Sequence, residues 1–276
     1  MSEEMSPEAS AEIGVIGGSG LYEFLDDAVT VEVPTPFGPP SDPLVIGEIA
    51  GRRVAFLPRH GADHRWPPHR IPYRANLWAL RAVGVRQVLA PSAVGSLTHD
   101  LPIGTLVVPD QVVDRTSGRD RTYYDGPPAG VVHVAFADPY CPAGRAVVLK
   151  RTAAAGWPAV DGATLVIIDG PRFSSRAESQ WYAAAGARII GMTGQPEAAL
   201  ARELALCYTP LALVTDLDAG IETGEGVTMA EVFRVFKENV GRLREVLMDV
   251  VAAMPTARDC PCGSTLDGLK TGIDLP

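Results

Sequence analysis

The chain has 276 residues, of which 46% are hydrophobic and 21% charged, and its formal net charge is −9. This balance is typical of a globular protein with a sizeable core, and the negative charge argues against general binding to nucleic acid or anionic lipid. No apolar run in the sequence approaches the roughly 20 residues that a membrane span needs.

The N-terminus is acidic and polar, without the basic and apolar regions of a secretory signal. We therefore expect a cytoplasmic protein in which residues 1–11 form a flexible tail. No repeat or long linker divides the rest of the chain. One domain is predicted over residues 12–256, and residues 257–276 are predicted to form a loosely structured C-terminal extension.

Strand-like apolar runs alternate with helical patterns along the chain, which predicts an α/β fold. The expected strands are Ile13–Ile16, Arg53–Leu57, Gln87–Ala90, Thr105–Val108, Thr164–Ile168, Arg188–Met192 and Pro210–Val214. The expected helices are Tyr73–Val83, Ser174–Ala185, Pro196–Leu206 and Met229–Ala253. Apolar residues recur in the last helix close to every 3.6 positions, and Thr228 with Glu231 forms a capping-box pattern at its start.

The first three expected strands end in segments that suit an anion. The first is followed by Gly17-Gly18-Ser19-Gly20, whose amides and hydroxyl can approach an anion, although the spacing is neither a dinucleotide fingerprint nor a P-loop. The second is followed by Arg59 and His60, a guanidinium fork and an imidazole donor. A third turn is expected over 91–96. Because ligands sit beyond the carboxyl ends of strands in open α/β sheets, the three turns can converge on one anion.

Residues 52–86 concentrate positive charge within this acidic chain. The segment holds eight arginines and three of the five histidines, and Asp63 is its only acid. Such a segment indicates either a small-anion site or a solvated basic face.

Three later segments carry further candidate ligand-binding groups. Phe173 is expected at a strand-to-helix turn, where its ring either stacks on a planar ligand or belongs to the core. Thr193 offers a hydroxyl at the next such turn. Asp216 and Asp218 end an apolar strand, and strand alternation places both on one side. They suit a base-reading pair, a solvated edge or a metal site. A metal is disfavoured, because no histidine or further carboxylate lies nearby at motif spacing.

The four cysteines are Cys141, Cys207, Cys260 and Cys262. The Cys260-Pro261-Cys262 pair is too close to supply a tetrahedral zinc site alone, and no Cys-x2-Cys partner exists. We therefore expect reducible or unreactive thiols in the tail and no metal site.

The stretches IGGSG, PRHG, PYRANLWAL, SAVGSL, DGPRFSSRAES, MTGQPEAALARE and TDLD, in this order, resemble the methylthioadenosine phosphorylase family of nucleoside phosphorylases. They span roughly Ile13 to Met254. The resemblance implies an α/β fold around a central mixed sheet flanked by helices, assembled as a homotrimer or a dimer of trimers. It also implies no metal or organic cofactor, with phosphate as a co-substrate. The implied partners are a purine nucleoside and inorganic phosphate, and neither nucleic acid nor a membrane. In some relatives a Cys-x-Cys tail forms disulfides.

The resemblance also assigns roles to residues by position. The implied phosphate site consists of Ser19, Arg59, His60, Ser92, Ala93 and Thr193. In the implied nucleoside site Phe173 stacks on the purine and Met192 flanks the ribose, while Asp216 and Asp218 meet N7 and the exocyclic amine. His133 resembles a residue that a neighbouring subunit sends toward the 5′ end. Val232 and Phe233 fit the apolar wall there, although their helical period also suits ordinary core.

The implied reaction converts S-methyl-5′-thioadenosine and phosphate into adenine and 5-methylthioribose 1-phosphate, a step of purine and methionine salvage. Phosphate held beneath C1′ would stabilise the positive ribose and capture it. Asp216 is the expected catalytic residue, handling a proton at purine N7.

Two departures from the family pattern bear on the substrate. Ser19 stands where the family commonly has threonine, which keeps the hydroxyl. Met192-Thr193-Gly194 resembles relatives that prefer 6-oxopurine nucleosides such as methylthioinosine, inosine or guanosine, whereas those relatives tend to carry asparagine in place of Asp216. A carboxylate accepts from a 6-amino group and repels a 6-oxo oxygen unless it is protonated, so adenine nucleosides are expected. A 6-oxopurine phosphorylase, a hydrolase and a non-catalytic purine-nucleoside sensor remain alternatives.

Overall fold

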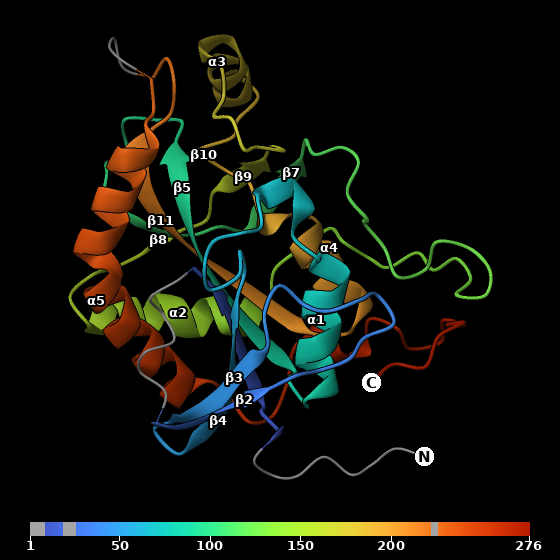
Figure 1. Cartoon of the computed structure of the whole chain (residues 1–276). Helices are drawn as coiled ribbons and strands as arrows, with labels where there is room; N and C mark the ends of the chain where they lie inside the picture. The colour runs from blue at the N-terminus through green and yellow to red at the C-terminus, as the bar shows by residue number, and fades with distance from the viewer. Residues whose placement is uncertain (1–8, 19–25, 222–225) are drawn as a thin grey trace.

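Strands and helices alternate along the chain and build one mixed sheet with helices on both faces, as a computed structural model shows (Figure 1). The structure describes residues 9–18, 26–221 and 226–276. In these residues the sheet has 11 strands, and its main path runs β2-β3-β4-β1-β5-β10-β9-β7. Strand β11 pairs with β5 and β6, and β8 pairs with β6. The predicted α/β class with a central mixed sheet is confirmed.

The strands and helices have well-defined bounds. The strands are β1 Ile13–Gly17, β2 Asp26–Val31, β3 Leu44–Ile49, β4 Arg52–Pro58, β5 Gln87–Ser96, β6 Leu106–Val108, β7 Gln111–Asp114, β8 Val160–Asp161, β9 Thr164–Ile167, β10 Ile189–Gly191 and β11 Cys207–Leu217. The helices are α1 Tyr73–Ala82, α2 Pro142–Ala154, α3 Arg176–Ala184, α4 Gly194–Glu203 and α5 Met229–Ala253, with short 3-10 turns η2 Pro68–Arg70 and η3 Pro261–Ser264.

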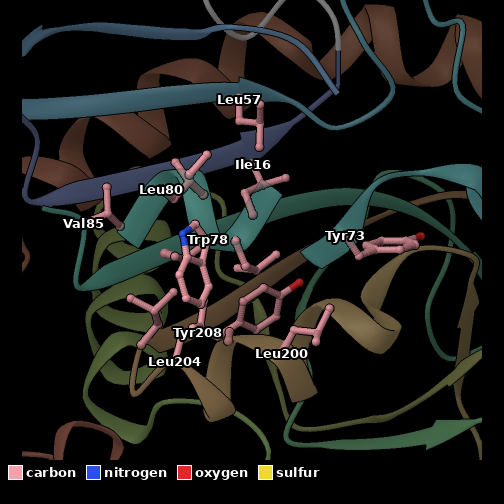
Figure 2. Close-up of a cluster of buried hydrophobic side chains, with 14 of the residues drawn as sticks. Ile16, Leu57, Tyr73, Trp78, Leu80, Val85, Leu200, Leu204 and Tyr208 are labelled. Atoms are coloured by element: carbon pink, nitrogen blue, oxygen red, sulfur yellow. The ribbon is translucent and has the colours of Figure 1, made fainter. Parts of the chain in front are cut away.

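Helices α1 and α4 cover one face of the sheet (Figure 1). Figure 2 shows the core beneath them, where Leu80 and Trp78 of α1 and Leu200 of α4 lie near Ile16 of β1 and Tyr208 of β11. These side chains are 8% exposed or less. The apolar face of each helix is buried against the strands, so hydrophobic burial fixes the two helices to the sheet.

Helices α2 and α5 cover the opposite face (Figure 1). The C-terminal half of α5 buries Leu243, Val246, Leu247 and Val250 in a second core with strand residues such as Leu213. Of the capping box predicted at the start of α5, the structure forms one of the two hydrogen bonds: Thr228 Oγ1 accepts from Glu231 N at 3.3 Å. The predicted bounds of α5 are confirmed.

Strand β5 is longer than predicted and corrects one expectation. A turn was expected over 91–96, but β5 continues to Ser96, because β11 pairs with it in parallel up to Leu217. Ser92 and Ala93 therefore lie in a strand. Helix α2 was missed because its apolar face is narrow, with Gly144, Val148 and Thr152 as its buried residues.

Residues 257–276 contact the body of the protein along much of their length. Cys262 is buried, the N–H of Gly272 donates to the carbonyl of Ala129 at 3.1 Å, and Ile273 and Leu275 pack against the core under α1. The division into a tail, a domain over 12–256 and an extension stays a prediction.

Candidate active site

A cavity of about 770 Å³ lies at the carboxyl ends of β1, β4, β5 and β11 and is walled by the first half of α5. All the predicted site residues line it except Ser19, which lies outside the described residues, and His133, which is exposed and away from the cavity. Those that line it are Arg59, His60, Ser92, Ala93, Phe173, Met192, Thr193, Asp216, Asp218, Val232 and Phe233. Residues that are distant in sequence thus share one site.

The cavity opens where the sheet divides along β5. Residues Gln87–Leu89 of β5 pair with β1, whereas Gly95 and Ser96 pair with β10 on the same edge. Between these two ladders, residues 90–94 have no strand partner on that edge within the described residues, while β11 stays paired on the other. Unpaired backbone groups in such a gap need another partner.

One of these backbone groups is the amide of Ala93. Peptide groups alternate in direction along a strand. The Pro91 carbonyl accepts from Arg59 on the open edge at 3.0 Å, and the Val94 carbonyl accepts from Thr215 of β11 on the paired edge at 3.3 Å. Alternation therefore turns the peptide N–H of Ala93 into the gap, toward the cavity.

Arg59 enters this gap from the end of β4, and its guanidinium is fixed by four hydrogen bonds. It donates from Nε and Nη2 to both carboxylate oxygens of Glu197 at 2.9 Å, from Nη2 to the Ile16 carbonyl and from Nη1 to the Pro91 carbonyl. Burial lowers the pKa of Arg59, but the attraction of Glu197 outweighs this and the net shift is upward. The fork expected to clasp phosphate is therefore engaged by Glu197, and one of its five N–H groups has no acceptor among the described residues.

His60 lies beside Arg59 with its ring against that of His64, at a centroid distance of 4.5 Å. Its Nδ1 is 2.8 Å from the Trp66 carbonyl. Burial, together with the positive charge of Arg59, lowers the pKa of His60 to about 4. The ring is therefore neutral at pH 7. Nδ1 donates to that carbonyl, so Nε2 is an acceptor rather than the donor expected from the sequence.

The segment from Met192 to Gln195 is held by Arg119, a residue that sequence reasoning missed. Arg119 is 8% exposed and donates to the carbonyls of Met192 and Gln195 at 2.9 and 2.5 Å. It also donates to the carbonyl of Asp169 at 2.9 Å. Arg119 thus ties together the two loops that carry Met192 and Phe173. The only signal in the sequence is an arginine inside a loop, too weak to single it out.

Asp216 and Asp218 face the same cavity from the end of β11, as strand alternation predicted, although a β-bulge shifts the register between Val214 and Asp216. They are 5% and 4% exposed. Both lie over Gly95 of β5, where an added Cβ would stand 2.8 Å from Asp216 Oδ1 and 3.3 Å from Asp218 Cβ. The absent side chain at Gly95 makes room for the acids.

The two carboxyls differ in their partners. Asp216 accepts a hydrogen bond from Thr215 Oγ1 at 2.9 Å, and burial raises the pKa of Asp216 to about 6, with a contribution from the nearby charge of Asp218. Burial raises the pKa of Asp218. The hydrogen bond that it accepts from Ser179 Oγ at 2.5 Å offsets only part of this rise. Asp216 is therefore suited to holding a proton near neutral pH.

The remaining wall of the cavity is mostly apolar, with Ser174 and Lys237 as polar members. Phe173 lines it from the turn before α3, and Met229, Val232 and Phe233 line it from α5. The ring of Phe233 stands edge-on to that of His64, with centroids 6.0 Å apart. Of the basic segment 52–86, only Arg59, His60, His64 and Arg65 line the cavity, so its other cations serve different contacts such as the pairing of Arg74 with Asp120.

Comparisons with known proteins show the family to which the chain belongs. The family model described as "Phosphorylase superfamily" matches residues 12–252. A protein named purine nucleoside phosphorylase from Streptomyces coelicolor is 63% identical, with 99% of this chain and all of that protein covered. One named S-methyl-5′-thioadenosine phosphorylase from Mycolicibacterium smegmatis is 55% identical, with 96% and 99% covered.

Solved structures are similar over most of the chain. A methylthioadenosine phosphorylase from an antarctic soil metagenomic library superposes with a TM-score of 0.88 at 40% identity, covering 94% of this chain and 92% of that one. The Schistosoma mansoni methylthioadenosine phosphorylase in complex with adenine has a TM-score of 0.83 at 37% identity, with 88% and 91% covered. By its sequence, its fold and the residues that meet at its cavity, the chain belongs to the phosphorylase superfamily.

Proposed function

We propose that this protein is a pentosyltransferase that cleaves S-methyl-5′-thioadenosine with inorganic phosphate, giving adenine and 5-methylthioribose 1-phosphate. The observation that carries the proposal is the pair of buried acids, Asp216 and Asp218, in one cavity with anion-binding groups from three strands. The relatives named S-methyl-5′-thioadenosine phosphorylase, at 55% identity and below, support it.

The phosphate is proposed to lie in the gap between β1 and β10. Its donors there are the Ala93 amide, the remaining Nη1 hydrogen of Arg59 and the hydroxyl of Thr193, which makes no capping hydrogen bond to α4. His60 Nε2 accepts from the P–OH of monohydrogen phosphate. Ser92 lines the same part of the cavity. One phosphate oxygen faces C1′ and forms the new C–O bond as the bond to the base breaks.

The purine is proposed to lie between Phe173 and the two acids. Asp216, when protonated, donates its proton to N7, which removes the negative charge that develops on the leaving base. The carboxylate of Asp218 accepts from the exocyclic amine. The ribose rests beside Met192, and the apolar side chains of α5, including Val232 and Phe233, surround the 5′-methylthio group.

Phosphorolysis of 6-oxopurine nucleosides is a second candidate, since the Streptomyces coelicolor relative is named purine nucleoside phosphorylase. For such a substrate the carboxyl of Asp218, which faces the exocyclic position, would have to be protonated so that it does not repel the 6-oxo oxygen. The Thr193-Gly194 pair does not weigh strongly for this alternative. Gly194 packs against β9, where an added Cβ would stand 3.1 Å from Ile167 Cδ1, whereas the cavity wall is formed by Met192 and Thr193.

The experiment is a substrate panel of methylthioadenosine, adenosine, methylthioinosine and inosine, each with and without phosphate, with free base measured as product. We expect methylthioadenosine to have the highest kcat/KM and no turnover without phosphate. Preference for inosine would overturn the 6-amino assignment. Turnover without phosphate would indicate a hydrolase, and binding without turnover a sensor.

The assembly is proposed to be a homotrimer or a dimer of trimers, in which His133 of one subunit approaches the 5′ end of a neighbouring site. His133 is exposed in the single chain, which leaves it available for such a contact. Size measurement in solution tests the assembly.

No helix in the described part of the chain combines the length and apolarity needed to cross a membrane.

A further inference from the structure

The four cysteines of the chain meet at one point, away from the cavity. The sulfur atoms of Cys141, Cys207, Cys260 and Cys262 all lie within 4.8 Å of one another. The Cys260 sulfur is 3.6 Å from that of Cys141 and 3.4 Å from that of Cys207. Four sulfurs bound to one zinc ion at 2.3 Å in a tetrahedron stand about 3.8 Å apart. The cluster therefore has nearly the dimensions of a zinc–thiolate site.

Three separate parts of the chain hold these thiols in place. Cys141 is the N-cap of α2, and its sulfur accepts a hydrogen bond from the Gly144 amide at 3.4 Å. Cys207 begins β11, Cys260 is the N-cap of the η3 turn and Cys262 lies within that turn. The fold therefore brings the sulfur atoms of three separate segments to one point.

Unpaired positive charge borders the cluster. Arg258 lies two residues before Cys260, and its guanidinium rests against Gly263, the residue after Cys262. The carbonyl of Arg86 accepts a hydrogen bond from the Cys207 amide. Arg81, Arg86 and Arg258 lie near one another: burial lowers the pKa of Arg81 to about 10, and the positive charges of Arg86 and Arg258 contribute to this shift. No acid among the described residues forms an ion pair with these three arginines. Zinc with four thiolates carries a net charge of −2, which this group of arginines would balance.

We propose that Cys141, Cys207, Cys260 and Cys262 bind one zinc ion in a tetrahedral structural site. The ion fastens the C-terminal segment to the start of β11 and to the N-terminus of α2. All four positions are taken by sulfur, so no position is left for substrate. Cys207 is nine residues from Asp216 along β11, which is about 30 Å at the usual rise of a strand, so the site takes no part in the reaction.

The test measures metal in the full-length protein, purified without a metal-affinity step and kept under a non-coordinating reductant. Zinc is determined by elemental analysis after addition of zinc and removal of the unbound ion. The expected result is one zinc per chain. Cobalt in place of zinc is expected to give the charge-transfer absorption of tetrahedral thiolate coordination. A strong chelator is expected to lower the Tm by roughly 10 °C.

A double variant, Cys260→Ser with Cys262→Ser, is expected to lose stoichiometric zinc and the response to chelator. Its matched control is Ser264→Ala in the same turn, which keeps all four thiols and is expected to bind zinc normally. Should the double variant fail to fold, the cobalt spectrum and zinc content of the unaltered protein decide the question. Reduced protein that takes up no zinc overturns the proposal. So does metal-free protein whose mass, measured without reductant, is lower by the four hydrogens of two disulfides.

Discussion

Asp216 occupies a position where folding and the proposed chemistry make opposite demands. The side chain is 5% exposed and its pKa is raised to about 6 from an ordinary value of 3.8. Between these two pH values the folded state therefore keeps a proton on Asp216 that the unfolded chain has released. Above pH 6 this carboxyl is ionised in a buried place and reduces the free energy of unfolding.

Replacing Asp216 with Asn is expected to lower turnover and raise stability together. Turnover of methylthioadenosine should fall by about 10²-fold or more, because the proton donor to N7 is lost. At pH 8 the variant should gain up to about 3 kcal/mol in free energy of unfolding, since a shift of about two pKa units is relieved. Urea unfolding at pH 4 and pH 8 measures this: the gain should shrink at pH 4, where the folded wild-type carboxyl is protonated and the unfolded one is only partly ionised. Equal stability of the two proteins at pH 8 would contradict the assignment.

Arg119→Lys is expected to impair the site while keeping the charge. Lysine cannot reach the several carbonyls that the guanidinium binds, so the loops carrying Met192 and Phe173 lose their common anchor. The kcat should fall about 10-fold or more and the KM for the nucleoside should rise, because small displacements of positioned groups are costly. The matched control is Arg115→Lys, an exposed arginine stacked on Trp181 at 5.0 Å, which should leave both constants unchanged.

Among single residues, the sequence predicted those that a local pattern marks, such as a polar or aromatic side chain following an apolar strand. Arg59, Phe173 and the acids 216 and 218 were found because each closes an apolar run, and they do line one cavity. Arg119 and Glu197 were not found. Their partners lie far away in the sequence, as in the Arg59–Glu197 pair separated by 138 positions, and such pairing leaves no local pattern.

At the scale of elements, the parallel pairing of β5 and β11 decides where the acids stand. Sequence patterning placed both strands but ended them too early, since the polar Ser92 indicated a turn and the apolar run before Asp216 ends at Val214. The polar side chains of Ser92, Thr215 and Asp216 line the cavity, while the backbones of β5 and β11 stay paired in this region. Strand ends at ligand sites are thus hard to predict from hydrophobic alternation alone.

Gly95→Ala tests the close approach of the acids of β11 to Gly95 of β5. The new Cβ would meet Asp216 Oδ1 at 2.8 Å and Ile190 Cγ2 at 3.1 Å, so the acid must move. Turnover should fall by about 10²-fold, whereas stability should fall by only about 1–3 kcal/mol. The control is Gly241→Ala on the exposed side of α5, where nothing lies within 4 Å of the added carbon. It should keep full activity and gain up to about 1 kcal/mol of stability. Full turnover in Gly95→Ala would show that this close approach does not position the acid.

For the whole molecule, the α/β class followed from the alternation of strand and helix patterns, but the strand order did not. The division of the sheet at β5 depends on a partner, β10, that arrives about 95 residues later in the chain. The meeting of four cysteines likewise joins residues up to 121 positions apart, from Cys141 to Cys262. Both depend on how distant segments pack, and local periodicity carries no information about that.

A buried charge network links several of these distant elements. Arg59 after β4 bonds Ile16 of β1 and Pro91 of β5, and its carboxylate partner Glu197 on α4 also accepts from Tyr208 Oη of β11 at 2.6 Å. Glu197 is fully buried and Arg59 is 3% exposed. Removing one charge would leave the other without compensation.

Glu197→Gln is therefore expected to destabilise the whole molecule by about 3–5 kcal/mol, which lowers the Tm by roughly 10 °C. Its matched control is Glu238→Gln, where an exposed carboxylate pairs with Arg234 one turn away. That exposed pair contributes about 0.5 kcal/mol or less, so the control should melt within about 2 °C of the wild type. Calorimetry measures both, and equal melting of the two variants would contradict the role given to the network.

The gap along β5 has a consequence for solvent exchange. The peptide hydrogen of Ala93 points into the opening, whereas its neighbour at Val94 is shared with β11. In the free protein the first should be replaced by deuterium quickly and the second slowly. Added phosphate should slow the first alone, as though the bound anion took the place of a missing strand. The factor by which phosphate slows exchange at Ala93 would measure how well the bound anion replaces the strand partner that this edge of β5 lacks.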